Sequence, residues 1–172
     1  MNTKNIIVCG LGGQGVIFAS TILTNILLAC TNFDIKTSEI HGISQRGGSV
    51  FVEIRIGDII YSPIISLKST NYLLDLSGTE YLNYLPKLSS SCVIIKRSND
   101  YITNSELEYE FEEINIDSFL NAYHLDIKSS NMILLSSLLR YLNFNYLTVK
   151  TALMNTPIGD SNLKALLVML KK

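Results

Sequence analysis

The first residues that could do chemistry form a glycine-rich turn. Residues 8–20 read VCGLGGQGVIFAS and hold four closely spaced glycines, which are Gly10, Gly12, Gly13 and Gly15. The spacing of Gly10, Gly12 and Gly15 fits G-x-G-x-x-G, a pattern that lets backbone N–H groups and a helix N-terminus surround a phosphate. We therefore take these glycines and Gln14 as candidate cofactor-binding residues. The alternative is that the glycines only permit a tight turn and close helix–sheet packing.

A dinucleotide site would need one more residue, an acid near the end of the second strand that binds a ribose. Glu39 is the only well-placed candidate, and it lies late in its expected strand. A stand-alone NAD(P)-binding Rossmann oxidoreductase therefore remains one alternative function.

A second glycine-rich segment follows at residues 38–49, SEIHGISQRGGS. Its candidate ligand-binding residues are Glu39, His41, Gln45, Arg46, Gly47 and Gly48. Arg46 could pair with a phosphate or carboxylate, or form an interface ion pair. His41 could act as a general acid or base, although a hydrogen-bonded structural histidine is the favoured interpretation. In a parallel sheet the segment would lie at the same carboxyl edge as the first loop, so that both flank one crevice.

The sequence shows no complete catalytic set. His124 has no recognisable partner pattern, and H-E-x-x-H, G-x-S-x-G and a P-loop lysine are missing. Cys9, Cys30 and Cys92 lie far apart and form no C-x-x-C pair, so we expect no metal or iron–sulfur site in this chain. They are best explained as buried free thiols in a reducing cytoplasm. Any cofactor chemistry is expected on another polypeptide.

The elements that position these loops begin with a strand at residues 5–9, a helix at 14–29 and a second strand at 33–40. This strand–helix–strand order indicates a parallel α/β sheet. We expect residues 1–172 to form one domain, a Rossmann-like three-layer α/β fold whose mostly parallel sheet carries an added β-hairpin.

The hairpin is expected from alternation at residues 49–57, a half-exposed strand, followed by a turn at Gly57 and Asp58 into a strand at 59–63. Further strands are expected at 71–77 and 91–98. A helix at 78–85 should stop at Pro86, and three more helices are expected at 129–143, at 147–154 and from 161. The acidic run between Glu106 and Glu113 is interpreted as a solvated strand or loop edge.

The composition indicates which kinds of partner this chain could bind. Hydrophobic residues make up 47% of the chain and charged residues 17%, which leaves little polar surface for a solitary monomer and favours a buried partner interface. The net charge of −1 argues against nucleic acid as a partner. Residues 5–33 carry no charge, but glycines and a polar helix stripe interrupt the run, so no membrane span is expected.

Three segments together, GLGGQGVIFASTIL, KTSEIHGISQRGGSVFVEIRIG and IYSP, resemble the gamma component of the 2-oxoacid:ferredoxin oxidoreductases. The E-I-H-G-x-x-Q-R-G-G-S-V form of the second loop is most similar to small (beta) subunits of the indolepyruvate ferredoxin oxidoreductases. The resemblance resumes more weakly at NMILL (131–135) and NLKAL (162–166). Asn71 stands near a place where the family often has aspartate, and the C-terminal part is short. These two departures leave the substrate open.

The resemblance implies an enzyme that oxidatively decarboxylates a 2-oxoacid, forms acyl-CoA and passes electrons to ferredoxin. Thiamine diphosphate, Mg and iron–sulfur clusters would belong to a large partner subunit. This chain would pack against that subunit and help to complete the region that coenzyme A approaches. It would be inactive in isolation, where it could also form a homodimer.

Overall fold

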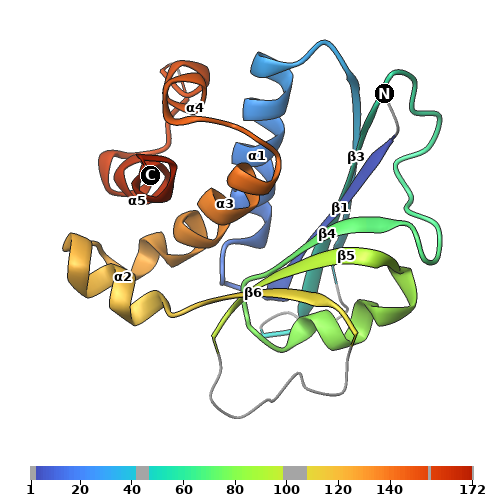
Figure 1. Ribbon diagram of the computed structural model, residues 1–172, viewed down its shortest axis with the longest axis horizontal. Helices are drawn as coiled ribbons and strands as arrows, with labels where there is room; N and C mark the ends of the chain where they lie inside the picture. Colours follow the sequence, from blue (N-terminus) through green and yellow to red (C-terminus); the bar gives the residue numbers. More distant parts are fainter. Residues whose placement is uncertain (1–2, 42–46, 99–107, 155, 172) are drawn as a thin grey trace.

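A six-stranded sheet forms the centre of the computed structural model, which describes residues 3–41, 47–98, 108–154 and 156–171 (Figure 1). Its strand order is β2-β3-β1-β4-β5-β6. The strands are β1 (Lys4–Leu11), β2 (Asp34–His41), β3 (Ser49–Gly57), β4 (Thr70–Asp75), β5 (Leu88–Arg97) and β6 (Glu110–Ile114). Neighbours from β1 through β4 and β5 to β6 are parallel, whereas β3 is antiparallel to both β1 and β2.

The mostly parallel sheet with a hairpin is confirmed, but the hairpin lies elsewhere than expected. It joins β2 to β3, and the expected strand at residues 59–63 is wrong, because residues 58–69 run as an irregular loop. Carboxylates bind backbone N–H groups that would otherwise pair with a neighbouring strand. Asp34 accepts a hydrogen bond from the N–H of Ile60 at 2.9 Å, and Glu53 accepts one from the N–H of Ile65 at 3.1 Å. We call residues 58–69 the β3–β4 loop.

Five α-helices of the described chain lie on one side of the sheet, where α1 and α3 pack on the strands and the others pack on these two helices (Figure 1). They are α1 (Val16–Cys30), α2 (Ile116–Tyr123), α3 (Ser130–Tyr141), α4 (Tyr146–Ala152) and α5 (Asp160–Val168), with short 3-10 turns η2 (Ile127–Ser129) and η3 (Met169–Lys171). Helix α3 is the central one, since its residues from Asn131 to Leu139 are all buried. The helices predicted at 14–29, 129–143 and 147–154 and from 161 are thereby confirmed, with small shifts at their ends.

The other face is covered by a 3-10 helix, η1 (Glu80–Lys87), and by the β3–β4 loop rather than by α-helices. The expected stop at Pro86 is wrong, because Pro86 lies inside η1. The expectation of a half-exposed β3 also fails at Glu53, which is fully buried and forms an ion pair with Lys87. An alternating strand cannot reveal that an irregular loop will fold over its polar face.

The acidic run is confirmed in its described part, where β6 is an edge strand with its glutamates at the sheet border. The Tyr141 hydroxyl of α3 lies between the Glu110 and Glu112 carboxylates of that strand, 3.1 and 3.0 Å away, and its one hydrogen is shared between them. Among the described helices, none is both long and apolar enough to cross a bilayer.

Candidate functional site

The two glycine-rich loops meet at one edge of the sheet. Strand β1 pairs with β3 up to Leu11 and Ser49, and the Gly12 N–H then donates to the Gly48 carbonyl at 2.9 Å. Strand β2 runs in the same direction as β1 and ends at His41 at this edge. The prediction that both loops share the carboxyl edge is confirmed. Gln45, Arg46 and the side chain of His41 lie outside the described residues.

Gln14 shapes the first loop from within. Its N–H donates to the Leu11 carbonyl at 3.0 Å, and its Oε1 accepts the Leu11 N–H at 2.7 Å. Gly13 and Gly15 have φ values of 95° and 81°, which favour glycine. Helix α1 then begins at Val16, and no side chain of the described residues caps it. A helix N-terminus without a side-chain cap favours negative charge near it.

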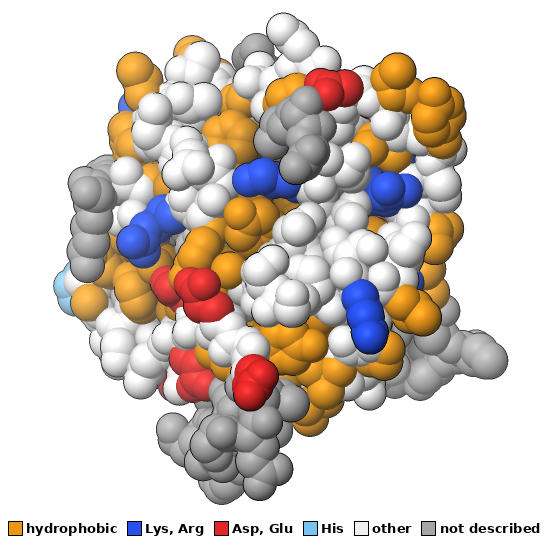
Figure 2. Space-filling model, turned by 45° about the vertical axis from the view of Figure 1, so that its right-hand side comes forward, with side chains coloured by type: hydrophobic (Ala, Val, Ile, Leu, Met, Phe, Trp, Pro, Cys, Tyr) orange, Lys and Arg blue, Asp and Glu red, His pale blue; other side chains and the backbone are white. Residues whose placement is uncertain are grey.

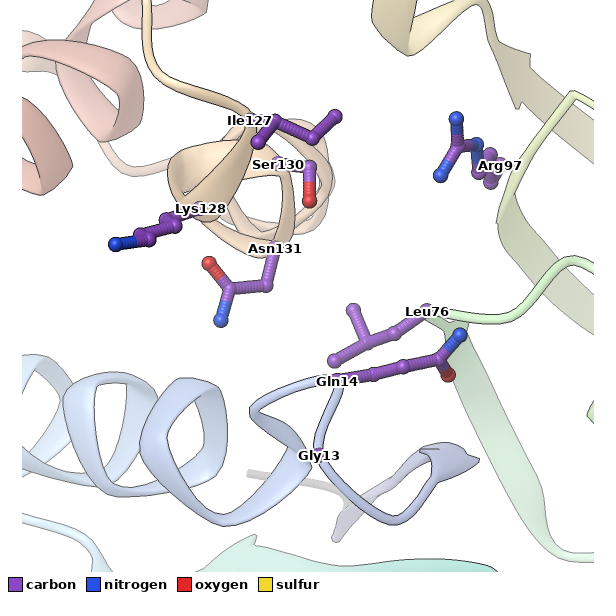
Figure 3. Close-up of a pocket in the computed structure, with 8 residues that line it drawn as sticks. All are labelled: Gly13, Gln14, Leu76, Arg97, Ile127, Lys128, Ser130 and Asn131. Carbon is purple, nitrogen blue, oxygen red and sulfur yellow. The ribbon is translucent and has the colours of Figure 1, made fainter. Parts of the chain in front are cut away.

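A pocket of about 270 Å³ opens between this loop and the start of α3 (Figure 3). Its lining residues are Gly13, Gln14, Leu76, Arg97, Ile127, Lys128, Ser130 and Asn131. They come from the glycine loop, from the ends of β4 and β5, and from η2 and α3. Sequence reasoning identified only Gly13 and Gln14 as site residues, because the others lie far away along the chain.

Two cations line this pocket. Arg97 ends β5, where its guanidinium lies 3.6 Å from the exposed Asp117 carboxylate. Lys128 lies in η2, whose start is fixed by Asp126, the carboxylate of which accepts the Lys128 N–H at 2.9 Å. The described residues that line the pocket include these two cations and no carboxylate, and Asp117 lies beside Arg97 outside the lining set. Its charge therefore favours an anionic ligand, and a guanidinium and an ammonium both bind phosphate well.

Asp75 organises the turn that leads from β4 into the pocket wall. Its buried carboxylate accepts the N–H groups of Ser77, Gly78 and Tyr81 at 2.8, 3.1 and 3.0 Å. Burial raises the pKa of Asp75 above its usual 3.8, and these hydrogen bonds limit the rise. The turn also touches β5, since a Cβ on Gly78 would lie 2.8 Å from the Arg97 carbonyl oxygen. Asp75 thus fixes the turn that carries Leu76 beside the end of β5.

Asn131 closes the pocket from the α3 side. Its side chain is 8% exposed and its Nδ2 faces Gly15, where a Cβ would collide with the amide. Its Oδ1 is buried and has no hydrogen-bond partner among the described residues. In the sequence, Asn131 is notable only as part of NMILL, a segment that resembles the family. No local pattern around it indicates a binding residue.

Glu39 lies away from the pocket that Gly13 and Gln14 line. It borders a small polar cleft of about 120 Å³ with the polar stripe of α1, lined by Ser20, Thr21, Thr24, Asn25, Thr37, Glu39 and Val52. Strand β3 lies between β1 and β2, which moves Glu39 one strand farther from the glycine loop, about 4.8 Å. Glu39 is not among the residues lining the pocket beside Gly13. The ribose-binding acid that a dinucleotide site needs is therefore not at this pocket in the described structure.

The cysteines show no reactive environment. Cys9 and Cys92 are buried, and burial raises the pKa of both thiols, that of Cys92 to about 12. Cys30 is partly exposed, and desolvation raises its pKa as well. In the described part of the chain, no group of three histidine, cysteine, aspartate or glutamate side chains could hold a metal ion.

Curated relatives are subunits of oxidoreductases. The indolepyruvate oxidoreductase subunit IorB of Methanothermobacter thermautotrophicus is 41% identical over 91 residues, 53% of this chain and 45% of the relative. The 2-oxoglutarate synthase subunit KorC of Archaeoglobus fulgidus is 30% identical over 116 residues, 67% of this chain and 60% of the relative. The chain spans about half the length of the IorB relatives that it matches. These relatives lend no support to the stand-alone NAD(P) alternative.

Solved structures share the fold. The gamma subunit of a keto/oxoacid ferredoxin oxidoreductase from Geobacter sulfurreducens aligns with a TM-score of 0.74 at 18% identity, over 98% of this chain and 94% of that chain. A 2-oxoglutarate:ferredoxin oxidoreductase from Magnetococcus marinus has 2-oxoglutarate, coenzyme A and succinyl-CoA bound. It aligns with a TM-score of 0.79 at 18% identity, over 99% of this chain and 30% of that chain. The family described as pyruvate ferredoxin/flavodoxin oxidoreductase matches residues 5–167. The resemblance seen in the sequence is thus confirmed, and the chain belongs to the pyruvate ferredoxin/flavodoxin oxidoreductase family.

Proposed function

We propose that this chain is the small subunit of a 2-oxoacid:ferredoxin oxidoreductase of the indolepyruvate type. The complex would oxidatively decarboxylate a 2-oxoacid, transfer the acyl group to coenzyme A and pass electrons to ferredoxin. The observation that carries the proposal is the family match over residues 5–167, together with identities of 33–41% to IorB subunits. Thiamine diphosphate, Mg and the iron–sulfur clusters would be held by a large partner subunit.

The chain's own contribution would be a phosphate site for coenzyme A. Arg97 and Lys128 line the pocket together with Gly13 and Gln14 of the glycine loop that precedes α1, and cationic side chains favour the phosphate oxygens of this substrate. The related Magnetococcus marinus structure contains coenzyme A, which supports this substrate class. Gln45 and Arg46 of the second loop remain predicted binding residues of this site. His41 stays a weak candidate for acid–base chemistry.

A partner surface is the second contribution. The β3–β4 loop exposes large hydrophobic side chains, which are Ile59, Tyr61, Ile64 and Leu67. The loop forms the green segment at the right of Figure 1, and hydrophobic side chains are spread over the face shown in Figure 2. Arg55 fixes the loop by donating to the Ser62 carbonyl at 2.8 Å and to the Ile64 carbonyl at 3.3 Å. Hydrogen bonds thus hold the loop in one conformation while its apolar side chains face outward. Such a surface is suited to a permanent protein–protein interface.

The deciding experiment expresses this chain alone and together with a large thiamine- and cluster-bearing subunit from the same genome. We expect the two to co-purify, and the complex to reduce ferredoxin only when both a 2-oxoacid and coenzyme A are supplied. The chain alone should show no such activity. A chain that neither associates with that subunit nor changes its activity would overturn the proposal. Comparing indolepyruvate with pyruvate and 2-oxoglutarate would identify the substrate.

Arg46→Ala tests the second loop in the assembled complex. We expect lower activity, either through weaker assembly or through a higher apparent KM for coenzyme A. Gel filtration measures assembly and initial rates give the KM, so the two causes separate. If both quantities stayed at the wild-type value, Arg46 would have no role in this site.

A further inference from the structure

A second pocket of the described chain lies among the outer helices. Its volume is about 400 Å³, within the range typical of small-molecule sites. It is formed by α4, α5 and the end of α2, which lie farther from the sheet than α1 and α3 (Figure 1). It shares no lining residue with the pocket beside the glycine loop. We call it the α4–α5 pocket, and its lining residues are Tyr123, Tyr146, Lys150, Asp160, Leu163, Lys164, Leu167 and Val168.

Helical periodicity brings these lining residues together. Those of α5 stand at positions 160, 163, 164, 167 and 168, which follow the i, i+3, i+4, i+7, i+8 spacing of one helix face. Tyr146 and Lys150 are likewise one turn apart on α4. Ala165 and Leu166 of α5 lie outside this face and are fully buried in the core. Helix α5 therefore packs on the core with one face and lines the pocket with another.

The walls of the α4–α5 pocket are apolar and aromatic. Leu163 and Leu167 supply aliphatic side chains from α5, while Tyr123 and Tyr146 supply rings from α2 and α4. The Tyr123 ring is held in place by stacking on Phe119, with ring centroids 6.0 Å apart and an angle of 16° between the planes. Aromatic rings pack favourably on one another beyond what their buried area explains. These walls therefore favour a ligand with an aromatic ring.

The polar groups of the pocket favour an anion. Lys150 and Lys164 outnumber Asp160, the single carboxylate among the described lining residues. Lys164 Nζ donates to the Tyr123 carbonyl at 3.0 Å, which uses one of its three hydrogens. Lys150 Nζ lies 5.8 Å from the centroid of the Tyr146 ring, a cation–π contact that uses none. Beyond these contacts both ammonium groups keep hydrogens to donate, and a carboxylate is a strong acceptor for them.

We propose that the α4–α5 pocket binds a small aromatic carboxylate, with its ring against the two tyrosines and its carboxylate beside Lys150 and Lys164. Such a ligand matches the apolar walls and the positive charge together, whereas an inorganic anion matches only the charge. Because it would contact α2, α4 and α5 at once, its binding would also stabilise the folded chain. The inference does not rest on the proposed coenzyme A site or on the large subunit.

The test titrates the full chain with three probes and follows the backbone amides by NMR, which measures weak binding. Phenylacetate carries both ligand parts, phenylacetamide keeps the ring without the charge, and cyclohexylacetate keeps the charge on a saturated ring. We expect phenylacetate to bind at least about fivefold more tightly than phenylacetamide, which loses the charge-assisted hydrogen bonds. It should bind at least about twofold more tightly than cyclohexylacetate, which loses the ring contacts. Equal Kd values in either comparison would overturn the assignment of an aromatic carboxylate.

Variants assign the binding to the α4–α5 pocket. Lys150→Gln and Lys164→Gln should each weaken phenylacetate about threefold and leave the Kd of phenylacetamide within about twofold, because each removes only a charge. Lys36→Gln is the matched control, on a lysine of β2 that is about half exposed and does not line the pocket, and it should change neither Kd. Leu163→Trp should fill the pocket and block all three probes. Should that variant not fold, the lysine variants still decide, since unchanged phenylacetate binding in both would contradict the proposal.

The position of the amide shifts separates this inference from the proposed function. Phenylacetate should shift amides of α4, α5 and the end of α2. Shifts confined to the glycine loop and the start of α3 would place the probe in the other pocket and overturn this inference, while the coenzyme A proposal would stand. In the complex, phenylacetate should bind with a Kd within about twofold of that for the chain alone. Displacement by the large subunit would assign the pocket to the protein interface and overturn the small-molecule site.

Discussion

The N–H of Gly12 donates to the carbonyl of Gly48 at 2.9 Å, just beyond the point where β1 and β3 stop pairing. This bond joins the two glycine-rich loops directly. Because β3 is the neighbour of β1, the end of the second loop is fixed to the first by strand register. A Cβ on Gly12 would lie 3.4 Å from the Gly47 nitrogen, so the two loops leave little room for a side chain there.

The first prediction concerns Gly15, where the glycine loop meets α3. Gly15→Ala should lower the free energy of unfolding by about 3 kcal/mol, since alanine is strained at φ 81° and its Cβ would collide with the Asn131 amide. Gly13→Ala is the matched control. Its φ is also positive, at 95°, but a Cβ there meets nothing within 4 Å, so a cost of about 1 kcal/mol is expected. Urea unfolding measures both, and equal costs would contradict this packing.

The sequence predicted those parts of the fold that local patterns determine. The strand, glycine turn and helix at residues 5–29 follow from apolar runs and glycine spacing, and the structure confirms them. The pairing partner of β3 could not be read in the same way. A Gly-Asp pair between two apolar runs indicates a hairpin, but the N–H groups of Ile60 and Ile65 are taken by the distant carboxylates of Asp34 and Glu53.

The candidate site was predictable only on its glycine side. Both loops are recognisable by their glycine content, and their position at one edge of the sheet follows from the direction of the strands before them. Arg97 and Lys128 have no local signature, because an arginine after a strand and a lysine in a short turn are common on any surface. Asn131 is likewise unremarkable in sequence, and only the packing of α3 against the glycine loop gives it a role.

The second prediction is a pH dependence caused by Asp75. Its pKa is raised in the folded state by burial, so the folded protein binds the proton more tightly than the unfolded chain. The stabilisation from Asp75 is therefore fully present below the usual pKa of 3.8 and is lost as pH rises through the folded value. The difference in unfolding free energy between wild type and Asp75→Asn should fall as pH increases above about 4. Denaturant titrations at several pH values measure it.

Asp34 provides a control of opposite sign. The N–H of Ile60 lowers the pKa of the Asp34 carboxyl, so its stabilisation is present above 3.8 and lost as pH falls through the folded value. The difference between wild type and Asp34→Asn should therefore shrink toward low pH. If both variants gave differences of the same slope, the assignment of the Asp75 shift to burial would be wrong.

The third prediction concerns the ion pair under the β3–β4 loop. Glu53 is fully buried and is paired with Lys87, which is partly exposed. Lys87→Met should lower the unfolding free energy by about 3 kcal/mol, because it leaves a buried carboxylate without its cation. Lys36→Met is the comparison, since the pair of Lys36 with Asp34 is exposed and should contribute under about 1 kcal/mol. Adding Glu53→Gln to Lys87→Met should recover part of the loss, and no recovery would contradict the cause.

The fourth prediction tests the β3–β4 loop as the surface that meets the large subunit. Tyr61 is 92% exposed, so Tyr61→Glu should leave the unfolding free energy of this chain within about 0.5 kcal/mol. In the complex the same change would bury a carboxylate, and the affinity for the large subunit should fall at least about tenfold. Leu147→Glu is the matched control, on an exposed side chain of α4 outside the loop. Surface plasmon resonance with immobilised large subunit measures both, and equal affinities for the two variants would exclude this loop as the interface.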